Sequence, residues 1–266
     1  MSNDLLWQHL LDLPYFRALL RAVEARFYQD IPLIEPVLDL GCGDGHFASA
    51  MPPHAPFVGL DPWWGPLTEA RSRTAYSLVM QASGAAMPFP SAHFGTVISN
   101  SVLEHIPSLD PVMAEVERVL VPGGRLVFCV PSDFFLAFLS ISRGLKRVGL
   151  SGPARAYEAF FNRISRHHHC DGPATWKARL DKAGLELVQH WYYFSKGALA
   201  ALEWGHYFGA PSLVTKKLFG RWILAPTRAN LWLTEKLVRR YYDELLPPEA
   251  SGAYLFFIAE KPTCPT

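Results

Sequence analysis

The sequence VLDLGCGDGHF, residues 37–47, places a tight glycine turn directly after a short apolar run. Glycine stands at every second position of this turn, as Gly41, Gly43 and Gly45. Glycine reaches positive φ at little steric cost, and its missing Cβ lets a ligand approach the backbone. A strand, a glycine turn and a helix in this order begin an open α/β sheet, which binds ligands beyond the carboxyl ends of its strands. The motif therefore predicts an α/β fold with a ligand at the turn.

Asp39 stands two residues before the first glycine and separates two classes of ligand. The spacing is GxGxG, whereas a dinucleotide-binding turn has GxGxxG and would need its third glycine at the position of His46. A carboxylate within about 4–6 Å of a pyrophosphate would also oppose its charge. An ammonium and a sulfonium would be favoured there. The turn thus favours S-adenosylmethionine and disfavours an oxidoreductase.

Apolar runs and helical patterns alternate through the first half of the chain. We expect strands at 37–40, 57–60, 77–80, 96–99 and 125–130, with helices at 47–51, 67–73 and 111–120. The PGG at 122–124 is expected to connect a helix to a strand. A helix at 174–182 and strands at 185–193 and 253–260 follow. The pattern predicts a doubly wound, mostly parallel, seven-stranded sheet.

Four motifs carry a family resemblance over residues 35–131, and the helix and strand at 174–193 extend it. They are VLDLGCGDG, the acid in FVGLDPWW, the stretch AAMPFPSAHFGTVISNSVLEHI, and ERVLVPGGRLVF. In this order they resemble the class I S-adenosylmethionine-dependent methyltransferases of the small-molecule, type 11-like kind. The resemblance implies a Rossmann-like fold and S-adenosyl-L-methionine as cofactor.

The resemblance also implies a set of cofactor-binding residues. Asp39 and the backbone of Gly41, Cys42 and Gly43 would hold the methionine part, and Asp61 would accept hydrogen bonds from the ribose hydroxyls. Pro62 with Trp63, or alternatively Trp64, would lie against the adenine, and Asn100 would lie near the sulfonium or the carboxylate. The family often has GDA where this chain has Ala82, Ser83 and Gly84, so a hydroxyl or backbone group replaces the usual acid there.

Histidines supply the candidate catalytic residues. His105, in LEHI after the fourth strand, could act as a general base, although packing and helix capping explain it better. In HHHCDG, 167–172, adjacent residues cannot all face one ion, and no second ligand cluster at zinc-finger spacing accompanies them. We therefore expect no metal site, and instead expect His168 or His169 to line the substrate pocket.

The chain is interpreted as a single methyltransferase domain, 1–266, with leading helices at 1–30 and cap insertions at 132–170 and 196–244. The insertions carry six Lys/Arg against two acids and eight against four, so each has a charge of +4. Aromatic residues interleave with these basic residues in 196–244. This composition suits a lid over an apolar or acidic substrate, or a surface on anionic lipid, and ordinary helix packing explains it nearly as well.

The sequence leads to the hypothesis of a methyltransferase that acts on oxygen or nitrogen of a small, lipophilic or acidic molecule. An amphiphilic acceptor is compatible with this hypothesis. A nucleic-acid methyltransferase is disfavoured because neither a Pro-Pro-aromatic motif after the fourth strand nor a Pro-Cys motif is present. A non-catalytic cofactor-binding partner protein stays open. No secretion signal is evident, and the scattered Cys42, Cys129, Cys170 and Cys264 favour a reduced, cytoplasmic protein.

Overall fold

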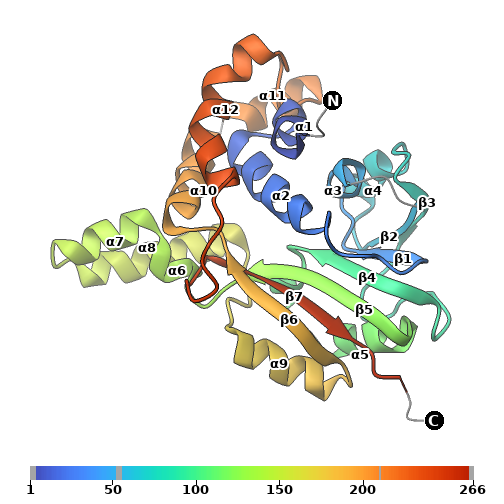
Figure 1. Ribbon diagram of the computed structural model, residues 1–266. Coiled ribbons are helices and arrows are strands. Elements are labelled where there is room, and N and C mark those ends of the chain that lie inside the picture. The colour runs from blue at the N-terminus through green and yellow to red at the C-terminus, as the bar shows by residue number, and fades with distance from the viewer. Residues whose placement is uncertain (1–3, 52–55, 210, 264–266) are drawn as a thin grey trace. The chain divides into compact units, whose positions relative to one another are not determined.

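A computed structural model describes residues 4–51, 56–209 and 211–263, and Cys264 lies outside these ranges (Figure 1). The chain separates into two compact units, each assembled from three stretches of sequence. The helical unit comprises Met1–Asp30, Phe134–Ser165 and Tyr192–Ala253, and the sheet unit comprises Ile31–Asp133, Arg166–Trp191 and Tyr254–Thr266. The leading helices and most of both insertions therefore gather in one unit. Their role as a cap over the sheet stays a prediction.

The sheet has the strand order β3-β2-β1-β4-β5-β7-β6 (Figure 1). Its strands are β1 Val37–Leu40, β2 Phe57–Asp61, β3 Tyr76–Gln81, β4 Phe94–Asn100, β5 Leu120–Pro131, β6 Glu186–Tyr193 and β7 Tyr254–Glu260. The first five strands pair in parallel, and β7 pairs antiparallel with β5. This confirms the doubly wound, mostly parallel, seven-stranded sheet.

Burial explains why these strands could be found in the sequence. Every residue of β1 and of β4 is buried, as in parallel strands covered on both faces, whereas the edge strand β3 has half of its residues exposed. The expectation for PGG was wrong, because β5 already begins at Leu120. The Gly123 N–H donates to the Lys261 carbonyl, and the Lys261 N–H donates to the Gly124 carbonyl. These bonds to the segment after β7 keep the glycines in the sheet.

Short helices cross between the strands of the sheet unit. They are α3 His46–Ala50, α4 Trp64–Ala70, the 3-10 helix η1 Leu103–His105, α5 Asp110–Val119 and α9 Pro173–Lys182. Pro111 and Pro173 occupy the first turns of α5 and α9, where their missing N–H costs no helical hydrogen bond. Each connection delivers the chain to the next strand, so the carboxyl ends of β1 to β4 lie at one edge.

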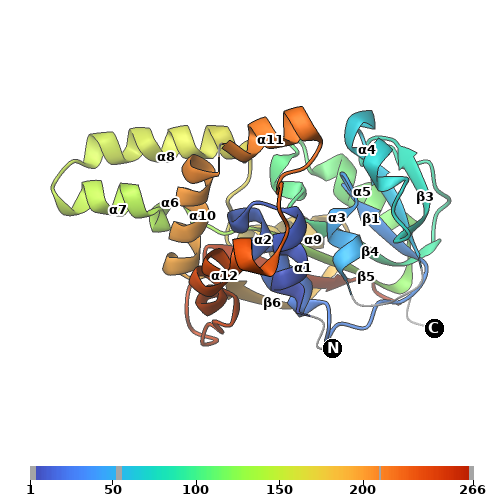
Figure 2. The ribbon, with the colours of Figure 1, turned by 90° about the horizontal axis from the view of Figure 1, so that it is seen from above.

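The helical unit contains eight helices within the described residues. They are α1 Leu5–Asp12, α2 Tyr15–Phe27, α6 Phe135–Phe138, α7 Ser140–Arg147, α8 Ser151–Ser165, α10 Lys196–Phe208, α11 Pro211–Phe219 and α12 Arg228–Tyr242. Helices α7 and α8 form a hairpin, which Figure 2 shows side by side. The buried Glu203 carboxylate accepts hydrogen bonds from the Ile141 N–H at 3.2 Å and the Tyr157 hydroxyl at 2.7 Å. This carboxylate therefore ties α10 to the start of α7 and to α8.

In the part of the chain that the structure describes, no helix combines the length and the apolar content needed to cross a bilayer.

Candidate functional site

The carboxyl ends of β1 to β4 bring the expected cofactor-binding residues to one edge of the sheet. Asp39 lies opposite Gly59 and Ile98, and Asp61 lies opposite Gln81. Asn100 is the last residue of β4, and Ser83 follows the end of β3. Residues spread from 39 to 100 thus share an edge because the strands are parallel and in register.

Two glycines of the turn have positive φ but different surroundings. Gly41 has φ +80°, and a Cβ built there would lie 2.6 Å from Val102 Cγ2. The Gly41 N–H donates to the Leu60 carbonyl at 2.7 Å, which joins the turn to β2. Gly43 has φ +54°, but a Cβ there would have no atom within 4 Å. Gly41 therefore serves close packing, whereas Gly43 faces open space that a ligand can fill.

Asp61 is held by the backbone of two neighbouring segments. Its Oδ2 accepts from the Gly43 N–H at 3.0 Å, and its Oδ1 accepts from the Trp63 N–H at 2.8 Å. The residue is 7% exposed. Because each carboxylate oxygen has two lone pairs, both oxygens can still accept from a vicinal diol. The carboxylate has the chemistry and the fixed orientation that a ribose requires.

Asp39 is 3% exposed, and its Oδ2 accepts a hydrogen bond from the Tyr76 hydroxyl at 2.6 Å. Burial, followed by the charge of Asp39, raises the pKa of the Tyr76 hydroxyl far above its usual range, so the phenol remains a donor. Tyr76 was not predicted as a site residue, and the third strand was expected to begin one residue later. Nothing local in the sequence marks this partner.

Carboxylates surround the glycine turn and give it a negative potential. Burial, then Asp39 and Asp61, raise the pKa of the Cys42 thiol well above its usual range, and Asp44 adds a smaller effect. The Gly43 N–H is already donated to Asp61. The turn thus presents acceptors rather than the donors that a pyrophosphate needs. Its residues fit a ligand with a cationic group and a diol, as S-adenosylmethionine has.

The expected adenine contacts follow β2 and β3. Trp63 is 73% exposed, whereas Trp64 lies beneath the Arg71 guanidinium at 5.6 Å from the ring centroid. Gln81 Nε2 donates to the Pro62 carbonyl at 3.0 Å and links the two segments. The Ser83 Oγ accepts from the Ala85 N–H at 3.2 Å. The adenine role of Trp63 stays a prediction, and Arg71 gives Trp64 another partner.

Gly84 and Asn100 lie on either side of β1 in the strand order. A Cβ at Gly84 would lie 3.1 Å from Leu40 Cδ1, so the loop after β3 packs closely on the end of β1. Asn100 is 6% exposed, and its Oδ1 accepts from the Cys129 thiol at 2.9 Å. The sulfonium-side role of Asn100 stays a prediction.

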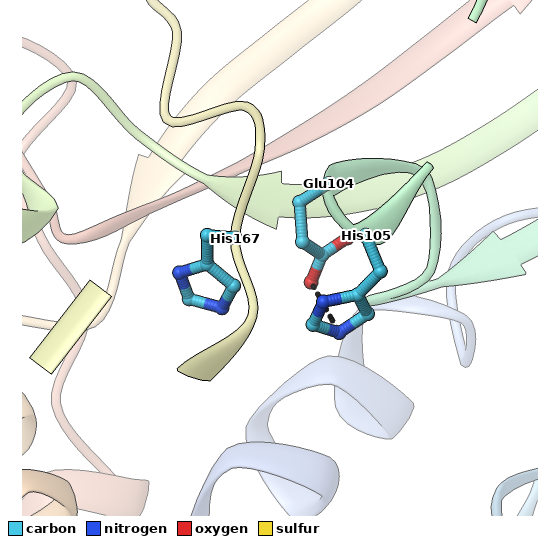
Figure 3. Close-up of side chains that lie close together, drawn as sticks. All are labelled: Glu104, His105 and His167. Carbon is cyan, nitrogen blue, oxygen red and sulfur yellow. Dashed lines mark ion pairs between the residues drawn. The ribbon is translucent and has the colours of Figure 1, made fainter. Parts of the chain in front are cut away.

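A second group of polar side chains lies at η1, the 3-10 helix that follows β4. Glu104, His105 and His167 each offer a ligand atom, and these atoms all lie within 4.8 Å of one another (Figure 3). Glu104 is 1% exposed, and its Oε1 lies 3.8 Å from His105 Nε2. The rings of His105 and His167 have centroids 5.4 Å apart. Of these three residues, only His105 was predicted from the sequence as a candidate site residue.

The histidine segment is anchored to η1 by backbone hydrogen bonds. The N–H groups of His168 and His169 donate to the Glu104 carbonyl at 2.7 and 3.3 Å. His168 is exposed, while His169 Nε2 lies 3.0 Å from the Ile106 carbonyl. The three adjacent histidines therefore differ in their surroundings, and it is His167 whose ring lies beside His105. The catalytic roles of His105 and His168 stay predictions.

Comparisons with known proteins return methyltransferases. Residues 38–128 match the family described as "Methyltransferase domain". An uncharacterized methyltransferase of Mycolicibacterium gilvum (strain PYR-GCK) is 31% identical over 196 residues, which is 72% of this chain and 69% of that protein. A malonyl-[acyl-carrier protein] O-methyltransferase of Legionella pneumophila is 34% identical over 98 residues, 35% of this chain and 34% of that protein.

Solved structures show the same fold. Geranyl diphosphate C-methyltransferase from Streptomyces coelicolor A3(2), solved with S-adenosyl-L-homocysteine, has a TM-score of 0.55 at 13% identity over 93% of this chain and 84% of that one. The matched family covers the glycine turn, Asp61 and the histidine of η1. On the similarity to the Mycolicibacterium gilvum methyltransferase and on the matched methyltransferase domain, the chain belongs to the class I S-adenosylmethionine-dependent methyltransferases.

Proposed function

We propose that this methyltransferase modifies oxygen or nitrogen of a small, lipophilic or acidic molecule. The observation that carries the proposal is the group of Glu104, His105 and His167, which brings three hydrogen-bonding side chains together at η1. Such groups bind and orient an acceptor with a polar head. The malonyl-[acyl-carrier protein] O-methyltransferase, whose name gives an acidic acceptor and attack by oxygen, supports the same class.

The cofactor supplies an activated methyl group when it is bound. Asp61 would hold the ribose hydroxyls, because Gly43 and Trp63 fix its carboxylate. Gly43 leaves room for the ligand beside the turn. Asp39 would act through the negative potential of the turn, since its carboxylate is buried and bonded to Tyr76. These residues orient the reactants, which is the main requirement for an in-line methyl transfer.

We further infer peripheral contact with an anionic membrane surface through α11. None of its side chains is buried, and its apolar residues Leu213, Val214, Leu218 and Phe219 are 57–67% exposed. Lys216 and Lys217 lie between these apolar positions. Clustered exposed apolar side chains with basic neighbours suit the boundary between acyl chains and anionic headgroups. A lipophilic acceptor would be met at such a surface.

The acceptor class is tested by incubating the purified chain with S-adenosylmethionine labelled in its methyl group and a cell extract. We expect label in the fraction of small organic molecules, and mass spectrometry then assigns oxygen or nitrogen. Label in nucleic acid would replace the proposal with the alternative enzyme class. Cofactor binding without transfer to any fraction would instead support the non-catalytic partner protein.

A further inference from the structure

We propose that Glu104, His105 and His167 form a binding site for a divalent transition-metal ion such as Zn²⁺ (Figure 3). No metal site was expected from the sequence, because the adjacent residues of HHHCDG cannot all face one ion and no second ligand cluster at zinc-finger spacing accompanies them. The structure supplies only one ligand from that segment. The other two come from η1, about sixty residues earlier in the chain.

The donor set suits such an ion. Two imidazole nitrogens and one carboxylate oxygen are ligands of catalytic zinc and of non-haem iron, and three protein ligands leave a position for water or substrate. Glu104 is 1% exposed, His105 has a side chain 41% exposed, and His167 is partly exposed. The group thus combines a buried anionic ligand with access from solvent.

The tautomer of His105 is set by the backbone. Its Nδ1 lies 3.0 Å from the Arg166 carbonyl, which only accepts, so Nδ1 carries the hydrogen. The lone pair is then on Nε2, the nitrogen 3.8 Å from Glu104 Oε1. A metal-binding histidine commonly donates its other N–H to a carbonyl or carboxylate in this way.

The spacing allows an ion after a small adjustment. Ligands about 2.0–2.1 Å from a tetrahedral ion lie roughly 3.4 Å apart, so the 3.8 Å pair is close to the required separation. The full group spans 4.8 Å, and an ion would draw the ligands together. The His168 N–H bond to the Glu104 carbonyl already holds the two segments at a fixed separation.

The role of the ion rests on the proposed function. A hydroxyl oxygen of the acceptor would bind the ion and release its proton to water, which leaves an oxygen lone pair available for methylation. The one position left open by the three protein ligands would bind a single oxygen of the acceptor, so the proposed site suits acceptors that carry a hydroxyl group.

The test measures metal binding without cofactor or acceptor. The full chain is stripped with a chelator, and Zn²⁺ is added in calorimetry while Co²⁺ is added with visible spectroscopy. We expect one ion per chain and a Co²⁺ spectrum of nitrogen and oxygen ligands. His167→Ala should weaken Zn²⁺ binding at least about 100-fold, since it removes one of three ligands. The matched control His168→Ala changes the adjacent, exposed histidine and should bind as the unaltered chain does.

Three outcomes would overturn the site: no saturable Zn²⁺ binding, equal binding by His167→Ala and the unaltered chain, or equal weakening by both histidine variants. Circular dichroism of each variant establishes that it is folded. Glu104→Gln, which keeps the shape of the side chain, should also abolish the Co²⁺ spectrum. If Zn²⁺ does not bind, the metal site is wrong but the proposed methyl transfer is not contradicted. If a metal-loaded chain methylates no small molecule, the proposed function is contradicted but the metal site is not.

Discussion

Two regions differ in which side chains they expose to solvent. The edge of the sheet at β1 and β2 buries charged side chains, whereas the helix α11 exposes apolar ones. Asp39 and Asp61 are 3% and 7% exposed, and each carboxylate accepts hydrogen bonds of 3.0 Å or less. On α11, Leu213 and Leu218 are 60% and 67% exposed. Buried charge is tolerated where donors are supplied, and clustered exposed apolar groups indicate a binding surface. The polar groups of the first region therefore find their partners within the chain, while the exposed apolar side chains of α11 are the basis of the proposed membrane contact.

The largest effect should come from Gly41→Ala at the organised edge. The added methyl meets Val102, and the backbone must hold φ +80°, so we expect a loss of about 3–4 kcal/mol in the free energy of unfolding. Urea denaturation measures it. The control Gly43→Ala has open space around its Cβ and should lose only about 1–2 kcal/mol while still weakening cofactor binding. Equal losses in stability would contradict the separate roles given to the two glycines.

Asp61→Ala examines whether the carboxylate held by the turn binds the cofactor. It removes the acceptor for two backbone N–H groups and for the ribose, so we expect Kd for S-adenosylmethionine to rise about 100-fold, or about 2.7 kcal/mol. Calorimetry measures Kd. Asp44→Ala, whose Oδ1 instead accepts from the His46 N–H at 3.0 Å, should raise Kd less than tenfold. Similar effects of both variants would show that charge alone matters at this turn.

Gly205→Ala extends the comparison to the interior of the helical unit. A Cβ there would lie 2.6 Å from Phe16 Cγ, where α10 meets α2, so we expect a loss of about 2 kcal/mol. Cofactor affinity should stay unchanged. Gly144→Ala on α7 has no atom within 4 Å of its Cβ and should be neutral or slightly stabilising by helix propensity. A large change in cofactor Kd in Gly205→Ala would contradict the prediction that cofactor binding depends on residues of the sheet unit.

Tyr76→Phe removes the donor to the Asp39 carboxylate and leaves the ring in place. We expect the free energy of unfolding to fall by about 1–2 kcal/mol, because a buried charge loses a hydrogen bond. Thermal denaturation measures the change. Tyr192→Phe, which makes the same change at a tyrosine of the helical unit, provides a comparison. An unchanged midpoint of thermal denaturation in Tyr76→Phe would show that other donors satisfy Asp39.

The smallest effect should appear on α11. Lys217→Ala should weaken sedimentation with phosphatidylserine vesicles about fivefold, since one basic residue near such a surface contributes about 1 kcal/mol. Raising the salt concentration should weaken binding of the unaltered chain as well. Lys177→Ala on α9, where Lys177 pairs with Asp181 at 2.7 Å, should leave sedimentation unchanged. No sedimentation of the unaltered chain would remove the membrane proposal.

Much of the sheet and the cofactor edge could be predicted from local sequence. Buried parallel strands such as β1 and β4 are continuous apolar runs, and their bounds were predicted to within two residues. The glycine turn and Asp61 were equally visible, since positive φ and a carboxylate at the end of a strand are properties of a few neighbouring residues. The early start of β5 was missed because its glycines bond to residue 261, far along the chain.

Other features depend on partners that are distant in sequence. Tyr76 reaches Asp39 across 37 residues, and His167 joins Glu104 and His105 from another segment. Likewise, three separate stretches assemble the helical unit. Backbone conformation and strand burial depend on neighbouring residues, so they leave a pattern in the local sequence. Side-chain partners depend on how distant segments pack in three dimensions, so neither residue of a pair identifies the other from the sequence.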